Sequence, residues 1–363
     1  MQDTGQINHA EMGAIIMKKS IFFGILLCSI FFITGQCQAA TDVEQDGLIY
    51  RLNQDTGTAV VMDCKDGDSV RREVRIPVSI QVEGKSYKVV EVGRCSFVMV
   101  NDIDTVYIPD SVVKISYAAF SSSYIKIIKI GKGVRTLGEN PFQFCKKLSK
   151  VIIDKKNPYI KMVNGAVYSK DGKTLLSCGV AKGHLVIPKK VKKIQKGAIS
   201  GTKSISKVSI LADIKELPEC CFQESHVKKV ILPKKLKTIK KDCFHDCVYL
   251  KGITLPNTLK RIEERAFYQC QMRELVIPKS VKWIHKNALY SCIERVIFKG
   301  KVPPRVKKQE DYIPDEAFED FDPPIEQIIP GITTVEVPKK YFKKYKKAIG
   351  TVSYTHLTLP TIA

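Results

Sequence analysis

Cysteine and histidine side chains are the residues of this chain best suited to nucleophilic or metal chemistry. Cys243, His245 and Cys247 lie close together, and Cys220 and Cys221 precede them. Thiolates and imidazoles bind zinc, but this spacing differs from the paired ligands of zinc fingers. The histidines share no fixed spacing with a Ser or Cys nucleophile, no carboxylate pair stands out, and no Gly-rich phosphate loop is present. The sequence therefore predicts no enzyme activity, no cofactor and no metal site.

The elements that would position these residues repeat every 22–23 positions. Counted from Pro233, apolar residues stand 3, 6 and 11 positions later and a Cys stands 14 positions later. The pattern recurs, in whole or in part, in at least seven copies. Each copy has two short stretches with alternating apolar residues, such as Leu236–Ile239 and Leu250–Leu255, which favour strands. One copy cannot bury its apolar side, but stacked copies can, so we expect a β-rich solenoid with ladders of equivalent residues.

The cysteines at offset 14 are expected to lie in one such ladder. They are Cys145, Cys247, Cys270 and Cys292. Free cysteine is a common small buried side chain, and a disulfide between parallel neighbours in a ladder would be strained. We therefore predict buried thiols here, and the sequence leaves open whether any cysteines pair.

A second set of equivalent positions is basic, in a chain whose formal net charge is +22. At offset 4 this set, here called the basic row, comprises Arg135, Lys192, Lys215, Lys237, Lys260 and Lys282. These residues flank apolar positions, so we expect them to face outward. Two interpretations remain open: a solvated face that keeps the protein soluble, or a binding track for a polyanion. Nucleic acid is not expected, because aromatic residues do not interleave with the basic row.

The N-terminal segment has the pattern of a secretory leader. We interpret residues 1–16 as a mis-annotated upstream extension and residues 17–40 as a signal peptide, since basic residues precede a short apolar run that ends in Ala39-Ala40. Cys37 raises the alternative of a lipid anchor, which Gln36 before it disfavours. No transmembrane span is expected after cleavage.

The remaining boundaries follow from breaks in the repeat. Residues 41–90 are predicted to form an N-terminal β cap. Residues 91–300 are predicted to form the solenoid, with a hairpin insert at 155–187 that turns at Asp171-Gly172. Residues 301–351 are expected to hold a last repeat and a cap with a Lys-rich helix from Lys339. Residues 352–363 resemble a translated sequencing adapter, and we interpret them as an artefact. A monomer is expected.

The stretch LPKKLKTIKKDCFHDCVYLKGITLP and its neighbours resemble the leucine-rich repeats of BspA-type surface proteins of host-associated bacteria. The segments DGLIYRL, NGAVYSKDGKTLL and VEVPKKYFKKYKKA resemble the same family, and the resemblance covers roughly residues 45–350. It implies a right-handed leucine-rich repeat solenoid that is secreted or held at the bacterial surface or envelope. It also implies adhesion-like binding of an extracellular protein, and the basic row, if it is a binding track, predicts an acidic glycan as the partner. The alternative is a structural envelope protein without a dedicated ligand.

Overall fold

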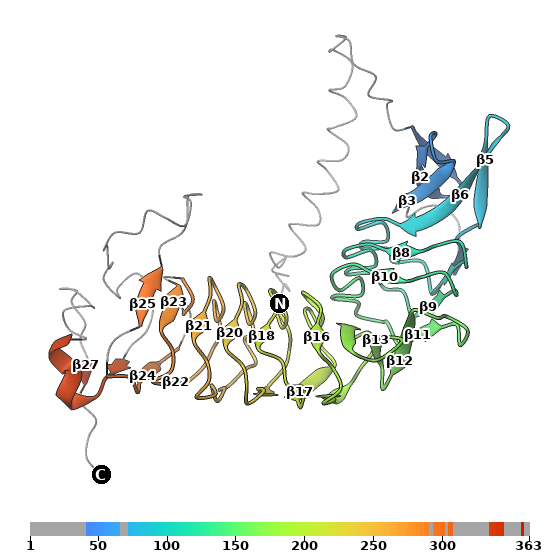
Figure 1. Ribbon diagram of the computed structural model, residues 1–363. Helices are drawn as coiled ribbons and strands as arrows, with labels where there is room; N and C mark the ends of the chain where they lie inside the picture. The colour runs from blue at the N-terminus through green and yellow to red at the C-terminus, as the bar shows by residue number, and fades with distance from the viewer. Residues whose placement is uncertain are drawn as a thin grey trace, which may run out of the picture.

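A computed structural model describes residues 41–65, 72–285, 287–289, 293–301, 304–307, 334–344 and 357–358. The described chain winds into successive coils whose short strands pair with the equivalent strands of the next coil (Figure 1). This is the predicted β-solenoid. The predicted leader, residues 1–40, lies outside the described residues.

The N-terminal part begins with an antiparallel hairpin that leads into parallel coils. Its first sheet contains β1 (Asp42–Gln45), β2 (Leu48–Asn53), β3 (Thr58–Cys64), β5 (Ser79–Val82), β6 (Lys85–Val92), β8 (Lys114–Ile115) and β10 (Thr136–Leu137). Its second sheet contains β4 (Glu73–Arg75), β7 (Thr105–Ile108), β9 (Ile127–Ile130) and β11 (Lys150–Ile153). Strands β2 and β3 pair as an antiparallel hairpin.

The insert forms an antiparallel meander, as its Asp-Gly turn predicts. It consists of β12 (Ile160–Val163), β13 (Ala166–Ser169) and β14 (Thr174–Ser177), after which β14 pairs in parallel with β16 (Lys193–Ile194). Gly172 has φ +73°, a conformation that costs glycine little and other residues about 1–2 kcal/mol. The insert thereby returns the chain to the regular coils.

The C-terminal part consists of parallel strands. One sheet contains β15 (Gly183–Ile187), β17 (Ile205–Ile210) and β19 (Lys229–Ile231). A second contains β18 (Glu216–Leu217), β20 (Thr238–Ile239), β21 (Arg261–Ile262), β23 (Trp283–His285) and β25 (Arg305–Lys307). A third contains β22 (Glu274–Ile277), β24 (Arg295–Phe298), β26 (Thr334–Glu336) and β27 (Leu357–Thr358). A short 3₁₀ helix, η2 (Lys339–Tyr341), begins where the Lys-rich helix is expected.

Two details differ from a uniform array. The stretch predicted as a strand at Leu250–Leu255 forms none, although Leu250 and Leu255 are both buried. Gly252 in its centre offers no side chain to pack, which weakens a strand. Strand β27 lies within residues 352–363 and pairs in parallel with β26.

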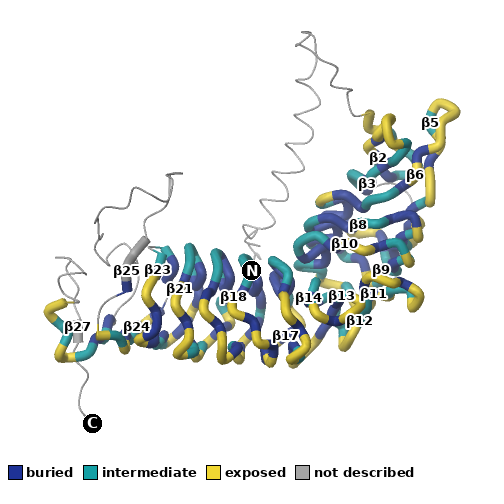
Figure 2. The backbone as a smooth tube through the Cα atoms, viewed as in Figure 1, coloured by how far each residue is buried: buried dark blue, intermediate teal, exposed yellow. Residues whose placement is uncertain are grey.

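The core is a set of aromatic ladders that run from coil to coil. The Phe222 and Phe244 rings stack with centroids 4.9 Å apart, and the Phe244 and Phe267 rings with centroids 5.2 Å apart. These spacings match the distance between paired strands, about 4.8 Å, because each ring sits at the same point of its coil. Buried residues line the inside of the coils along their length (Figure 2).

The core is divided where the insert interrupts the coils. One buried apolar cluster extends from Leu48 to Val167 and the other from Ala166 to Val337. Polar side chains connect the coils there: Asn140 Nδ2 donates to the Ser200 carbonyl oxygen at 2.6 Å, and Ser177 Oγ donates to Asn140 Oδ1 at 2.8 Å. The array bends in this region, so its two parts run in different directions (Figure 1).

Candidate functional site

The structure places four residues of the basic row in direct register. The backbone N–H of Lys237 donates to the Lys215 carbonyl oxygen at 2.7 Å, Lys260 to Lys237 at 2.7 Å, and Lys282 to Lys260 at 2.9 Å. All four side chains are exposed. We call Lys215, Lys237, Lys260 and Lys282 the lysine row. It lies just before strands β18, β20, β21 and β23, which hold each lysine at the same point of its coil.

The other two residues of the basic row lie apart from these four. The Lys192 N–H donates to the Lys173 carbonyl oxygen, and the Arg135 N–H donates to the Val113 carbonyl oxygen. Each therefore belongs to a different sheet, because the insert separates the coils of Arg135 and Lys192. Both side chains are exposed. The insert thus separates Arg135 from the rest of the basic row, whereas Lys192 lies in the coil next to that of Lys215 but in another sheet.

The lysine row carries positive charge that forms no ion pair with a described residue. No residue of the lysine row forms a salt bridge with a described residue, and the same holds for Arg135 and Lys192. In contrast, Lys235 Nζ lies 2.7 Å from Asp213 Oδ2, and Lys240 Nζ lies 3.0 Å from Glu216 Oε2. Acids near the row are therefore engaged by lysines outside it, which leaves the positive charge of the row uncompensated by direct contact.

The pKa of Asp213 shows the effect of the positive charges around it. Its pKa is lowered chiefly by the hydrogen bond from Lys235, with further contributions from the charges of Lys192 and Lys189. The carboxylate stays ionised at neutral pH and is held by Lys235. Successive ammonium groups of the row, about 5 Å apart if their side chains ran parallel, would repel each other by roughly 0.8 kcal/mol in water. A bound anion would relieve that repulsion.

Two residues beside the basic row were not predicted. Trp283, the single tryptophan of the chain, follows Lys282 directly, is 37% exposed, and donates its backbone N–H to the Lys260 carbonyl oxygen at 3.2 Å. Lys173 belongs to the insert, which lacks the repeat offsets, so only pairing with the next coil reveals its place beside Lys192. The repeat offsets could have placed Trp283 next to the row, but they do not predict that its side chain is partly exposed.

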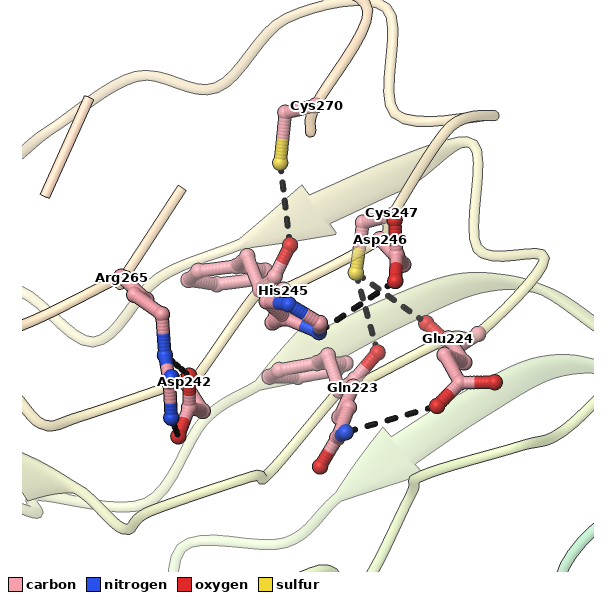
Figure 3. A network of polar contacts seen from close by, with 11 residues as sticks. Gln223, Glu224, Asp242, His245, Asp246, Cys247, Arg265 and Cys270 are labelled. Atoms are coloured by element: carbon pink, nitrogen blue, oxygen red, sulfur yellow. Dashed lines mark hydrogen bonds and ion pairs between the residues drawn. The ribbon is translucent and has the colours of Figure 1, made fainter. Parts of the chain in front are cut away.

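The turns between Gln223 and Cys270 carry a network of polar contacts (Figure 3). Arg265 donates to both carboxylate oxygens of Asp242, at 2.7 and 2.8 Å. Gln223 Nε2 donates to Glu224 Oε1 at 3.4 Å, and burial raises the Glu224 pKa, with the charge of Asp246 acting in the same direction. The Arg265–Asp242 pair joins successive coils, whereas the Gln223–Glu224 contact lies within one turn.

The cysteine ladder lies in the same turns as these polar contacts. Cys247 Sγ donates to the Phe222 carbonyl oxygen at 2.9 Å, and Cys270 Sγ donates to the Phe244 carbonyl oxygen at 3.0 Å (Figure 3). Burial raises the pKa of Cys247 to about 12. This thiol is neutral at pH 7 and a poor nucleophile, because the thiolate is the reactive form. None of the nine cysteines in the described part of the chain forms a disulfide bond, and Cys292 lies outside those residues.

The His245 ring packs between two coils. Its ring stacks on Tyr268 with centroids 5.0 Å apart, and its Nδ1 lies 3.4 Å from Asp246 Oδ2. Burial lowers the His245 pKa, against the opposing charges of Asp246 and Asp242. The ring is a packed element between two coils, because consecutive turns bring aromatic and imidazole rings into register.

The described residues contain neither a cluster of metal ligands nor a membrane-spanning helix. No group of three or more His, Cys, Asp or Glu residues within them is arranged to hold a metal ion. Among the helices of these residues, none has the length and apolar character needed to cross a membrane.

Comparisons with known proteins agree with the repeat. The family model of the BspA type leucine rich repeat region matches residues 80–167 and 177–295 in six copies. A leucine-rich repeat protein from Bacteroides ovatus has a similar structure, with 21% identity over 88% of this chain and 77% of that one, and a TM-score of 0.52. A leucine rich cell surface protein from Faecalibacterium prausnitzii is 15% identical over 72% of this chain and 96% of that one, with a TM-score of 0.47. No curated protein matches the chain. With more than half of its residues matched by this family model, the chain belongs to the BspA type leucine-rich repeat family.

Proposed function

We propose that this protein is an exported bacterial surface protein whose coils bind an extracellular partner, with the lysine row as the contact surface for an acidic protein or glycan. The family supports a surface protein with protein-binding repeats. The leader pattern of residues 17–40 supports export. Binding to the outside of a regular array suits a solenoid, because stacked coils offer an extended surface.

The observation that carries this proposal is the register of four unpaired lysines. Backbone bonds fix the spacing of the lysine row, and no described acid forms a salt bridge with it. A regular line of cations suits a partner with regularly spaced anions, such as a sulfated glycan or an acidic peptide segment. Two lysines close to the row, Lys235 and Lys240, are instead paired with acids.

The proposal is tested by retention on a heparin column in a salt gradient. A variant with Lys215, Lys237, Lys260 and Lys282 changed to Gln should elute at clearly lower salt than the wild type. The matched control changes four exposed lysines without salt bridges elsewhere, namely Lys85, Lys88, Lys155 and Lys156. Both variants lose the same charge, so a general charge effect would shift them equally.

Comparison of the two variants distinguishes binding at the lysine row from a general effect of net charge. Loss of retention in the lysine-row variant alone supports the proposal. Equal elution of the two variants would contradict it and would favour a scaffolding protein whose charge serves solubility. Circular dichroism of both variants should match the wild type, because every changed side chain is exposed.

A further inference from the structure

A pocket of about 380 Å³ lies between the insert and strand β15, and none of the basic-row residues lines it. One wall comes from β12 and its turn, with Lys161 and Val163. The opposite wall comes from β15 and the residues around it, with Lys182, Val186 and Lys190. We call this space the insert pocket. It exists only because the insert interrupts the coils, so no other coil repeats it.

The insert pocket is lined by three lysines, and the charge of one of them, Lys161, helps to lower the pKa of the nearby Asp171 carboxylate. A Cβ atom built on Gly172 would lie 2.8 Å from Lys190 Nζ and 3.4 Å from Lys161 Nζ, so both ammonium groups converge on one point. Lys161 Nζ also donates to the Lys170 carbonyl oxygen. Neither Lys161, Lys182 nor Lys190 forms a salt bridge with a described residue. Two ammonium groups this close attract an anion between them.

The nearby acid is already engaged. Asp171 Oδ1 accepts hydrogen bonds from Ser169 Oγ at 2.7 Å and from the Lys173 N–H at 2.9 Å. These bonds lower the Asp171 pKa, the one from the Lys173 backbone most of all. Asp171 is therefore an ionised carboxylate that caps its own turn, and it leaves the ammonium groups of the insert pocket available to a ligand.

The remaining lining combines apolar and polar side chains. Val163 and Val186 are 41% and 42% exposed although they are large apolar side chains. Asn164, His184 and Tyr168 contribute polar groups to the same pocket. Tyr168 is only 4% exposed as a residue, but its hydroxyl is not a buried unsatisfied atom, so it is open to water or to a ligand in the pocket.

We propose that the insert pocket binds one acidic sugar residue, a pyranose that carries a carboxylate or a sulfate. The anionic group would lie between Lys161 and Lys190, a ring hydroxyl would meet Tyr168, and the C–H face would cover Val163 and Val186. A small inorganic anion would leave the apolar side chains uncovered, and a neutral sugar would leave the ammonium groups without a counter-charge. The volume falls within the range of ligand pockets, about 300–1,000 Å³. This site is separate from the lysine row, so it holds whether or not the row binds a polyanion.

Ligand titrations followed by saturation-transfer NMR test this site on the full chain. The probes are glucuronate, glucose 6-sulfate and glucose, with a tetraglutamate peptide as the acidic peptide. We expect glucuronate or glucose 6-sulfate to bind about tenfold more tightly than glucose, a difference of the size one charge-assisted contact gives. Comparison of the two acidic sugars distinguishes a carboxylate ligand from a sulfate ligand.

Four variants locate the binding. The Lys161→Gln, Lys190→Gln double variant should weaken binding of the acidic sugar about tenfold, and Tyr168→Phe, which removes only a hydroxyl, about threefold. Val186→Glu places a carboxylate at an exposed edge of the insert pocket and should also weaken it. The matched control, Lys85→Gln with Lys88→Gln, removes the same charge outside both proposed sites and should leave it unchanged. Thermal unfolding shows which variants are folded, and Val186→Glu provides a test at an exposed position if the others are destabilised.

Four results would overturn the insert pocket as an acidic-sugar site. The first is equal binding of glucose and both acidic sugars. The second is full binding by the folded Val186→Glu and Lys161→Gln, Lys190→Gln variants. The third is an equal loss of binding in the Lys85→Gln, Lys88→Gln control. The fourth is binding of tetraglutamate without binding of either acidic sugar. The first two would leave the proposed role of the lysine row untouched, so failure of one proposal is distinguishable from failure of the other.

Discussion

Phe244 lies in the interior between Phe222 and Phe267, with ring centroids 4.9 and 5.2 Å away and none of its surface exposed. Removing it would leave a cavity between two coils that are held by their backbones. We predict that Phe244→Ala lowers the free energy of unfolding by about 3–5 kcal/mol in urea titrations. Leu211→Ala is the control, because Leu211 is 50% exposed, and it should change stability by no more than about 0.5 kcal/mol. Similar losses for both would contradict a stacked core.

The buried thiols make a second prediction, on pH. Burial raises the pKa of Cys145, Cys178 and Cys247 to about 12, above the unfolded value near 9. The unfolded chain therefore loses these protons first as pH rises. Stability from these groups is fully present below pH 9 and falls between pH 9 and about 12, by up to roughly 1.4 kcal/mol per pH unit for each thiol.

Urea unfolding midpoints at pH 8, 9.5 and 10.5 measure this effect. Lysines and tyrosines also titrate in that range, so the control is a variant with all three cysteines changed to Ala. It should be less stable at pH 8 and should lose stability more slowly with rising pH. The same pH dependence in both proteins would show that these thiols are not protected as described.

The buried ladders could be predicted at single residues, whereas the ion pairs could not. Offsets from Pro233 placed Phe244 and Cys247 inside because a buried position must repeat when coils stack. The pairing of Lys196 with both Glu139 and Glu219, at 3.4 and 3.1 Å, depends on how far long side chains reach across the bend. The spacing of residues along the sequence does not show which side chains meet across the bend.

At the scale of elements, the turn of each coil uses left-handed backbone at fixed positions. Pairs of such residues four apart recur along the array, as in Asp242 and Asp246 (φ +54° and +55°) and in Gly197 and Gly201 (φ +64° and +61°). Only one coil fills both positions with Gly, so glycine did not mark these turns in the sequence. The prediction of a strand at Leu250–Leu255 was wrong for a different reason. Alternating apolar residues determine which side chains are buried, but they do not ensure that the backbone pairs with a neighbouring strand.

Gly201 and Gly252 provide a matched pair of substitutions. A Cβ on Gly201 would lie 2.8 Å from the Phe144 ring and would add left-handed strain. We predict that Gly201→Ala destabilises the protein by at least about 1–2 kcal/mol. Gly252 has no atom within 4 Å of a built Cβ, and Gly252→Ala should be neutral or stabilise by up to about 1 kcal/mol. Thermal unfolding measures both, and a neutral Gly201→Ala would contradict the close packing of the two coils at the bend.

For the whole molecule, the repeat predicted a solenoid but neither its bend nor the insert pocket. Both arise where the insert separates coils, and a period has no information about the place where it is interrupted (Figure 1). The basic row was predicted as six aligned residues. Four of them lie in one register, and Arg135 and Lys192 belong to other sheets. Stacking thus converts a period in the sequence into a surface only within an uninterrupted run of coils.

Trp283 makes binding at this surface measurable. It is the single tryptophan, it is partly exposed, and it lies beside Lys282 and Lys260. A titration of the protein with heparin at low salt should therefore change its tryptophan emission to saturation. The change should weaken as salt rises, because the screening length falls to about 10 Å at 0.1 M salt. The variant with Lys215, Lys237, Lys260 and Lys282 changed to Gln should show little change, and the Lys85, Lys88, Lys155, Lys156 control should respond like the wild type. Full, saturable binding of heparin by the lysine-row variant, with the same emission change, would contradict a binding surface built from these stacked lysines.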